Sequence, residues 1–277
     1  MNLQRRDFLR GSAAAAALAV GGCVGDAPPQ WTRTTVHHMA WPVHRPLTIA
    51  HLTDLHLGWG APEPLLSRTL RMCREHRPDL TVLTGDYLIN SLEHIQDLGA
   101  LARRLPRPCL ATLGNHDHRA GAGVVQEVFQ RAGIPVLRNA SYRLTVRDTP
   151  LVVVGIDDGY TEHHDVDRAM SDLLPGERAI VLSHLPDLVD EVSGYGDHLV
   201  LAGHTHGGQI YFPLVSPFLA DLAGHRYLAG WYEVGGAQLY VNVGIGCARF
   251  RRRIGARAQP ELAIIKLLPS RDASRDA

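Results

Sequence analysis

The stretch Gly203-His204-Thr205-His206 places two imidazole side chains directly after an apolar run. The run, Leu199–Ala202, is typical of the end of a buried strand, and Gly203 lets the backbone turn sharply. Alternate residues of an extended segment point to the same side, so His204 and His206 can converge on one point. Histidine is the commonest metal ligand in proteins. The pair by itself fits a metal site and a polar turn equally well.

Four other segments place metal-type side chains directly after an apolar, strand-like run. They read Asp54-Leu55-His56, Gly85-Asp86, Gly114-Asn115-His116-Asp117 and Ser183-His184. Ligands of open α/β folds gather outside the carboxyl ends of strands, so we expect the five turns to meet in space. Mixed imidazole and carboxylate ligands suit Mn, Fe or Zn better than Ca or Mg. The sequence therefore predicts a metal site at strand C-terminal ends.

In order and spacing, these segments resemble the five motifs of the calcineurin-like metallophosphoesterases. The similarity covers residues 31–268. The stretches Gly203-His204-Thr205-His206-Gly207-Gly208-Gln209 and Val243-Gly244-Ile245-Gly246 resemble the bacterial envelope branch, which carries Tat signals. The resemblance implies a phosphoesterase with two divalent metal ions.

Carried over by position, the resemblance also implies a role for each side chain. Asp86 would bridge the two metals. One metal would be held by Asp54, His56 and His206, and the other by Asn115, His184 and His204. A water between two cations is activated for in-line attack on phosphorus. His116 would then protonate the leaving oxygen or stabilise the transition-state charge, and Asp117 either orients His116 or caps a helix.

The leading functional hypothesis is a phosphodiesterase that acts on a small-molecule or lipid-linked substrate. A phosphomonoesterase or nuclease on the same centre is an alternative, and so is a metal-binding envelope protein without catalysis. His116 argues against the last of these, because a binding module needs no general acid. The Asp-Arg pair of the protein phosphatase motif GDxxDRG is missing from Gly85-Asp86-Tyr87-Leu88-Ile89-Asn90, which argues against protein dephosphorylation. Equal totals of 28 basic and 28 acidic residues argue against a broad nucleic-acid footprint.

Two segments leave alternatives open. The basic run Arg249-Phe250-Arg251-Arg252-Arg253 is either a solvated loop or a binding surface for an anionic substrate or lipid head groups. The apolar stretch between Tyr211 and Leu228 is either core or lid, or an apolar wall that accepts acyl chains or touches the membrane.

The N-terminus reads as an export signal. Arg5-Arg6 precedes the apolar stretch 13–20, which is shorter than the roughly 20 residues that span a bilayer, so residues 1–23 resemble a Tat signal and imply contact with the Tat translocase. Val20-Gly21-Gly22-Cys23 resembles a lipobox, which implies an envelope lipoprotein anchored through Cys23; a plain cleavable signal is the alternative. The other three cysteines show no paired spacing and are expected to be free buried thiols.

The remaining pattern predicts one domain over residues 31–268, between a linker at 24–30 and a disordered tail at 269–277. Strands are expected at 31–38, 47–52, 80–83, 109–113, 135–137, 142–146, 151–156, 179–182, 199–202, 238–243 and 262–268, and helices at 63–76, 91–105 with Ser91 as N-cap, 123–132, 166–174 and 185–192. This order predicts a layered αββα sandwich of two mixed β-sheets flanked by helices. His37, His38 and His51 are expected to be strand histidines, not ligands.

Overall fold

The computed structural model of the chain describes residues 32–58, 61–208, 226–247, 253 and 258–270. The predicted signal peptide and linker, the stretch 211–225, the arginines at 249, 251 and 252, and residues 271–277 of the predicted tail lie outside the described residues.

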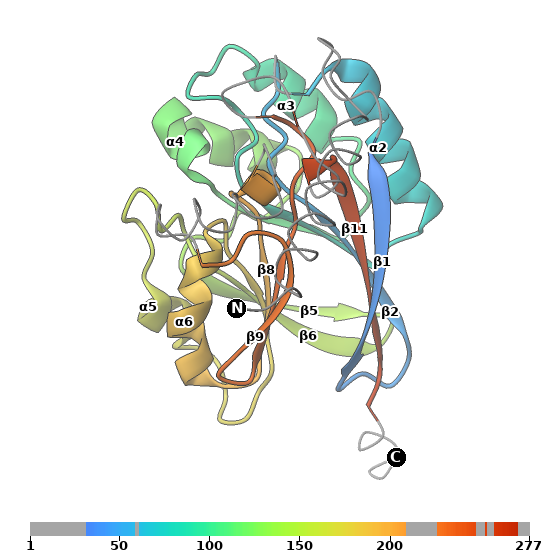
Figure 1. The fold of residues 1–277 in the computed structure, drawn as a ribbon, viewed down its shortest axis with the longest axis vertical. Coiled ribbons are helices and arrows are strands. Elements are labelled where there is room, and N and C mark those ends of the chain that lie inside the picture. The colour runs from blue at the N-terminus through green and yellow to red at the C-terminus, as the bar shows by residue number, and fades with distance from the viewer. Residues whose placement is uncertain (1–31, 59–60, 209–225, 248–252, 254–257, 271–277) are drawn as a thin grey trace, which may run out of the picture.

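Two mixed β-sheets form the centre of the fold (Figure 1). The first has the strand order β1-β11-β2-β3-β4 and consists of β1 (Arg33–Trp41), β11 (Glu261–Pro269), β2 (Leu47–Leu52), β3 (Leu80–Thr84) and β4 (Cys109–Thr112). The second has the order β5-β6-β7-β8-β10-β9 and consists of β5 (Ala140–Val146), β6 (Thr149–Gly155), β7 (Ile180–Leu182), β8 (Leu199–Ala202), β10 (Ala237–Val241) and β9 (Gly230–Val234). The strands β2, β3 and β4 run parallel, as do β6, β7, β8 and β10.

The side chains of each central strand alternate between two apolar layers. In β2, Ile49 packs into the layer between the two sheets and Ala50 into the layer under the helices of the first sheet. In β6, Val153 faces the layer between the sheets and Val154 faces the helices of the second sheet. Because successive strand residues point to opposite faces, strands buried on both sides read as continuous apolar runs. The predicted αββα sandwich is therefore confirmed.

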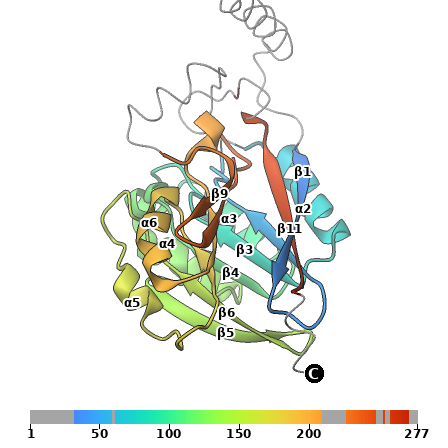
Figure 2. The same ribbon diagram turned by 60° about the horizontal axis from the view of Figure 1, so that its bottom comes forward.

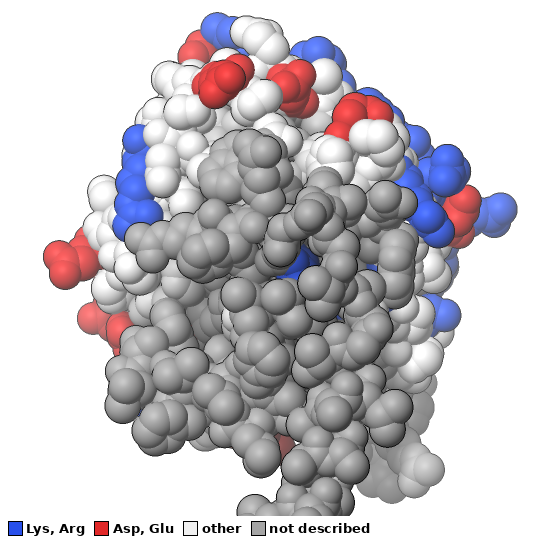
Figure 3. Space-filling model, turned by 45° about the horizontal axis from the view of Figure 1, so that its top comes forward, with Lys and Arg blue, Asp and Glu red and all other residues white. Residues whose placement is uncertain are grey.

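Helices cover the outer face of each sheet (Figures 1 and 2). On the first sheet they are α2 (Glu63–Glu75), α3 (Ile95–Ala102) and α4 (Asn115–Arg131). On the second sheet they are α5 (Val166–Met170) and α6 (Val189–Val192), the latter flanked by the 3₁₀ turns Pro186–Leu188 and Ser193–Tyr195. A further 3₁₀ turn, His206–Gly208, follows β8. Basic and acidic side chains of the described residues are interspersed on the face of the molecule in Figure 3, in line with the equal totals in the sequence.

Several predicted boundaries were wrong for identifiable reasons. The helix expected at 123–132 begins earlier, at Asn115. Gly121 (φ 131°) leaves the helical conformation and divides α4 into two pieces, and the sequence pattern predicted only the second piece. The helix expected from Ser91 begins at Ile95, and its N-cap, His94, has no side-chain cap hydrogen bond. The strand expected at 135–137 is a single bridge between Ala111 and Val136.

Strand β9 was not predicted. It pairs with β10 through the two-residue turn Gly235-Gly236, where φ is 56° and 97°. These values suit a tight hairpin turn, and two glycines adopt them at little steric cost. The two glycines between Val234 and Ala237 were the signal for this hairpin.

The three cysteines among the described residues, Cys73, Cys109 and Cys247, are free and buried as expected. The strand histidines also lie where the pattern placed them, with His37 and His38 on β1 and His51 on β2. His51 is fully buried, and its Nε2 lies 2.9 Å from Thr84 Oγ1. Burial lowers the pKa of His51 from 6.5 to about 3, so the ring is neutral in the folded protein at pH 7.

This burial predicts an acid-sensitive contribution to stability. The pKa of His51 is lower in the folded chain than in the unfolded chain, so the unfolded state binds a proton first as the pH falls below 6.5. The stability is present above that pH and declines toward pH 3, by up to about 1.4 kcal/mol per pH unit. His51→Gln should flatten the fall in the unfolding free energy between pH 6.5 and 5, measured by urea denaturation. His38→Gln, at an exposed position on β1, is the matched control, and an unchanged slope in His51→Gln would contradict the prediction.

Candidate metal centre

The turns after β2, β3, β4, β7 and β8 meet at one edge of the sandwich and bring the predicted ligands together. Three groups of side chains have ligand atoms that all lie within 4.8 Å of one another. They are Asp54, His56 and His206; His56, Asp86 and His116; and Asp86, His184 and His204. The groups share His56 and Asp86, so they form one continuous cluster built from both sheets.

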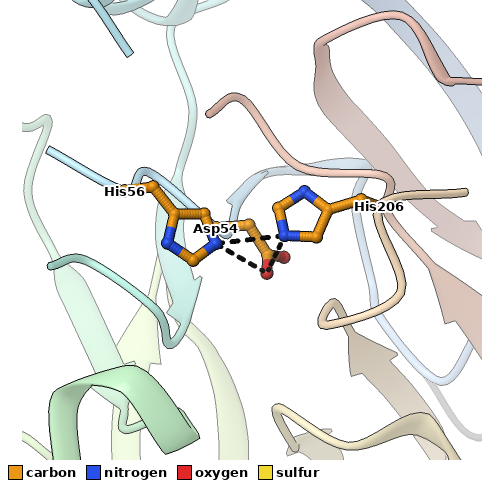
Figure 4. Close-up of side chains that lie close together, drawn as sticks. All are labelled: Asp54, His56 and His206. Carbon is orange, nitrogen blue, oxygen red and sulfur yellow. Dashed lines mark hydrogen bonds and ion pairs between the residues drawn. The ribbon is translucent and has the colours of Figure 1, made fainter. Parts of the chain in front are cut away.

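The first group is Asp54, His56 and His206, whose side chains face one another in Figure 4. His56 Nε2 lies 3.0 Å from His206 Nε2, and Asp54 Oδ1 lies 3.4 Å from His206 Nε2 and 3.8 Å from His56 Nε2. All three residues are buried. Burial lowers the pKa of His56 to about 3 and that of His206 well below its ordinary value, so both rings are neutral. Neutral imidazoles are the form that binds metals.

The carboxylate of Asp54 is only half satisfied by hydrogen bonds. Its Oδ2 accepts from Thr53 Oγ1 at 2.8 Å and from the backbone N–H of His204 at 3.0 Å. Its Oδ1 is buried and has no hydrogen-bond partner among the described residues. Burial raises the pKa of Asp54 to about 6. An unpartnered buried carboxylate oxygen that faces two neutral ring nitrogens fits a cation at their common point.

The second and third groups are both arranged around Asp86. Its Oδ2 lies 3.2 Å from His184 Nε2, 3.7 Å from His56 Nε2 and 3.9 Å from His116 Nε2. His184 Nδ1 donates to the carbonyl of Thr84 at 2.7 Å, which turns Nε2 toward Asp86. Burial alone would lower the pKa of His184, but the Asp86 carboxylate raises it to about 10. A cation bound here would take the place of that proton.

The amide of Asn115 points toward His204 of the third group. One of its two side-chain polar atoms lies 3.1 Å from His204 Nδ1. With the oxygen in that place, two lone pairs face each other, which is favourable only with a cation between them. With the nitrogen there, the oxygen accepts from the His116 N–H at 3.3 Å and from Arg119 Nη1 at 3.1 Å. The first orientation fits a metal ligand and the second a metal-free hydrogen-bond network.

The backbone of these turns is strained. Five of the cluster residues have φ in the left-handed region, namely Asp54 (51°), His56 (45°), Asp86 (56°), His204 (72°) and His206 (52°). Each such non-glycine residue costs about 1–3 kcal/mol and persists only where the surroundings enforce it. Bonds between turns do so here, since the N–H groups of Asp54 and His56 donate to the carbonyls of Gly85 and Asp86, both at 3.0 Å. The strain points to a functional requirement for these side-chain directions.

Asp117 ties two of the turns together through their backbones. Its carboxylate accepts from the N–H groups of Gly114 at 3.0 Å, Asp86 at 2.8 Å and Tyr87 at 2.9 Å. Gly114 is the N-cap of α4, so Asp117 caps the helix from its third position. No hydrogen bond from Asp117 to the His116 ring occurs among the described contacts, so the expected orienting contact is not observed.

His116 lies at the edge of the cluster. Its side chain is 18 % exposed, and its ring meets that of His56 edge-on with centroids 4.9 Å apart. Its backbone N–H donates to Asp86 Oδ1 at 2.9 Å, which holds the start of α4 over the cluster. The pKa of His116 is below its ordinary value, because the effect of burial exceeds the opposite effect of the Asp86 carboxylate. The ring is therefore open to an incoming ligand on one side and in contact with the cluster on the other.

Comparison with known proteins agrees with this geometry. A family model described as calcineurin-like phosphoesterase matches residues 47–208, which is more than half of the chain and includes every cluster residue. The chain belongs to the calcineurin-like phosphoesterases. Members of this family use a dimetal centre, and the protein is a metal-dependent phosphoric ester hydrolase. A model of the twin-arginine translocation signal matches residues 2–22, which confirms the predicted Tat signal.

Three relatives match 80% or more of the chain. The uncharacterized metallophosphoesterase YkuE of Bacillus subtilis is 32% identical over 96% of this chain and 98% of its own length. Phosphodiesterase YaeI of Escherichia coli is 31% identical over 96% of this chain and 100% of its own length. The UDP-2,3-diacylglucosamine pyrophosphatase LpxG of Chlamydia trachomatis is 26% identical over 80% of this chain and 84% of its own length.

A solved structure supports the fold of this phosphoesterase. The 5′-nucleotidase precursor from Thermus thermophilus aligns with 82% of this chain and 55% of its own, at 16% identity and a TM-score of 0.51. At this identity the likeness shows the fold alone. The Tat signal indicates export across the membrane, and within the described ranges there is no helix with the length and apolarity of a membrane span.

Arg253 is a residue of the site that sequence reasoning misplaced. We expected it in a solvated loop or on a binding surface, but it is buried. Its Nη1 donates to the carbonyls of Val243 at 2.7 Å and Ala258 at 3.1 Å, and its Nε donates to that of Gly246 at 2.8 Å. Its Nη2 lies 3.0 Å from His206 Nδ1 and donates to it, because a guanidinium has no acceptor. Arg253 therefore fixes the His206 ring from the side opposite the cluster.

Removal of this guanidinium should destabilise the fold. Arg253→Met leaves three buried carbonyl groups without this donor, so the unfolding free energy should fall by about 1.5–3 kcal/mol in urea denaturation. Arg253→Lys should recover only part of this loss, because an ammonium cannot reproduce the planar fork. Arg103→Met, at an exposed position after α3, should change little. Equal unfolding free energies for Arg253→Met and the wild type would show that these contacts contribute no stability.

Proposed function

We propose that the protein is an exported phosphodiesterase that uses two divalent cations. The observation that carries the proposal is the position of Asp86, whose Oδ2 lies within 4 Å of ring nitrogens of both His56, from the first group, and His184, from the third. A shared carboxylate at this point suits two cations better than one. The catalytic domain would comprise residues 31–268 and would be active after the signal is removed.

Each cluster residue then has a role. Asp54, His56 and His206 would hold one cation, Asn115, His184 and His204 the other, and Asp86 both. Two such cations supply an activated water and neutralise charge on the phosphoryl oxygens. Imidazole-rich ligands favour Mn, Fe or Zn. The contact of His184 with the Thr84 carbonyl puts the ring proton on Nδ1 and leaves Nε2 to face the cation. The contact of Arg253 with His206 Nδ1 holds that ring in place but does not select the metal-binding form, because a donor at Nδ1 favours the proton on Nε2.

His116 would act on the leaving group. Its side chain is 18 % exposed, so its ring would be able to reach the oxygen that departs from phosphorus. Burial lowers the pKa of His116, which makes the protonated ring scarce in the free protein. An anionic substrate would raise that pKa again, so we place proton donation after substrate binding. Asp117 would serve as a positioning residue that holds the His116 and Asp86 turns together.

The names of the relatives guide the choice of substrate. One relative is named a phosphodiesterase and another a UDP-2,3-diacylglucosamine pyrophosphatase. A diester, with lipid-linked diesters included, is therefore the substrate class that we propose. A phosphomonoesterase or nuclease activity on the same centre remains the alternative.

The proposal predicts a metal-dependent activity that needs His116. Protein reconstituted with Mn should hydrolyse bis(p-nitrophenyl) phosphate, and His116→Ala should lower kcat by roughly 10²–10⁴ while both metals stay bound. Metal content is measured by mass spectrometry, and His38→Ala is the control for loss of an exposed histidine. Rates on p-nitrophenyl phosphate and on DNA separate the alternatives. Failure to hydrolyse any of these esters with two metals bound would refute the proposal.

Anchoring at the envelope is a second part of the proposal. The small residues Val20-Gly21-Gly22 before Cys23 fit lipidation of that cysteine after export. Cys23→Ala should move the exported protein from the membrane fraction to the soluble fraction, measured by fractionation and immunoblotting. Membrane association that survives the substitution would exclude anchoring through Cys23.

A further inference from the structure

Two exposed side chains lie beside the cluster and have no part in the ligand groups. Arg119 is on α4, three residues after His116, and Tyr160 is in the loop that follows β6. Residues three apart on a helix share a face, so His116 and Arg119 are neighbours on the surface of α4. The β6 loop was not among the five segments identified from the sequence, although Asp157-Asp158-Gly159-Tyr160 also follows an apolar strand.

Arg119 carries a positive charge without a carboxylate partner among the residues that the structure describes. Its Nη1 lies 3.1 Å from the Asn115 side chain, whose oxygen accepts the bond in one orientation of the amide. An exposed guanidinium at this place can receive the oxygens of an anionic group.

Tyr160 fixes the position of this guanidinium. The Arg119 Cζ lies 5.4 Å from the centroid of the Tyr160 ring, within the range of a cation–π contact. The same ring lies 5.2 Å from the ring of His204, so it connects Arg119 to the third group, that of Asp86, His184 and His204. The loop is held by Asp158, whose Oδ2 accepts from the N–H and hydroxyl of Thr161 at 2.7 and 2.6 Å. Tyr160 is 53 % exposed and can meet a ligand directly.

We propose that Arg119, supported by Tyr160, binds a phosphate in the leaving group, so that the enzyme favours pyrophosphate diesters over simple phosphodiesters. The inference rests on the proposed function. The reason is the placement of Arg119 beside His116 on α4. If His116 protonates the leaving oxygen, the neighbouring guanidinium faces the leaving group as well.

The cleavage that this implies is a hydrolysis. A bond forms between the water oxygen and the attacked phosphorus, and the bond from that phosphorus to the bridging oxygen breaks. The electron pair of the broken bond stays on the bridging oxygen, which leaves as part of a phosphate monoester. One proton of the water remains on the first product, and the leaving phosphate receives the other through His116 and solvent. Arg119 balances the charge that accumulates on the leaving phosphate.

Substrates that differ in the leaving group test this assignment. UDP-glucose has a phosphate in its leaving group, whereas p-nitrophenyl thymidine 5′-phosphate loses nitrophenolate from a comparable diester. Arg119→Ala should lower kcat/KM on UDP-glucose by about 10-fold to 100-fold, and on the nitrophenyl ester by less than about 3-fold. Arg119→Lys should restore part of the loss, because it keeps the charge but not the planar fork. Tyr160→Phe keeps the ring and should keep the preference for UDP-glucose over the nitrophenyl ester, whereas Tyr160→Ala should lose part of that preference but less than Arg119→Ala.

A binding experiment tests the same inference without turnover. Its result can therefore be interpreted even if the protein does not hydrolyse the substrates above. UMP and UDP are titrated into Mn-loaded protein by calorimetry, and bound metal is counted for each variant. The wild type should bind UDP more tightly than UMP, and Arg119→Ala should remove most of that difference with both metals retained. Arg131→Ala, an exposed arginine at the end of the same helix, is the control and should keep the preference. A UDP preference that survives Arg119→Ala, or an equal loss of affinity for both nucleotides, would overturn the proposal.

Discussion

The buried charge of Asp86 is the constraint on which the rest of the site depends. A carboxylate removed from water must be compensated by hydrogen bonds and positive charge, and here these come from elements far apart in the chain. The N–H of His116 at the start of α4 donates to one oxygen, and His184 after β7 approaches the other. The helix α4 packs on the first sheet, and β7 belongs to the second. The Asp86 carboxylate therefore has both partners only when the two sheets are packed together at this edge.

That these side chains lie together could be predicted from the sequence because the strands that precede them are buried on both faces. Such strands read as plain apolar runs, so a polar residue directly after the run marks the carboxyl end. This applies to Asp54, Asp86, Asn115, His184 and His204, and the structure brings all five segments together. The layered order of the fold followed from the same runs. The left-handed turns that aim the side chains were not predicted, because they fall on non-glycine residues such as Asp54 and His204, which rarely adopt a positive φ.

Three features could not be found by this reasoning, each for a physical reason. Arg253 is one of four arginines in a short basic run. The sequence does not show which of the four is buried and donates hydrogen bonds to backbone carbonyl groups. The first turn of α4 precedes two glycines that suggest a loop, but Asp117 and its backbone donors stabilise a helical start there. The β6 loop follows an apolar strand as the motif segments do, yet it contributes through Tyr160, a residue type that carries no metal signature.

The contrast in burial between the centre and its edge has a consequence for how such an enzyme can diversify. Asp54, His56 and His184 are closed in by backbone and core, so a change at any of them disturbs packing throughout both layers. Arg119 and Tyr160 stand in solvent, where replacement alters little besides what they touch. Single substitutions at exposed positions such as Arg119 and Tyr160 can therefore change substrate recognition during evolution, while the buried cluster and the fold stay the same.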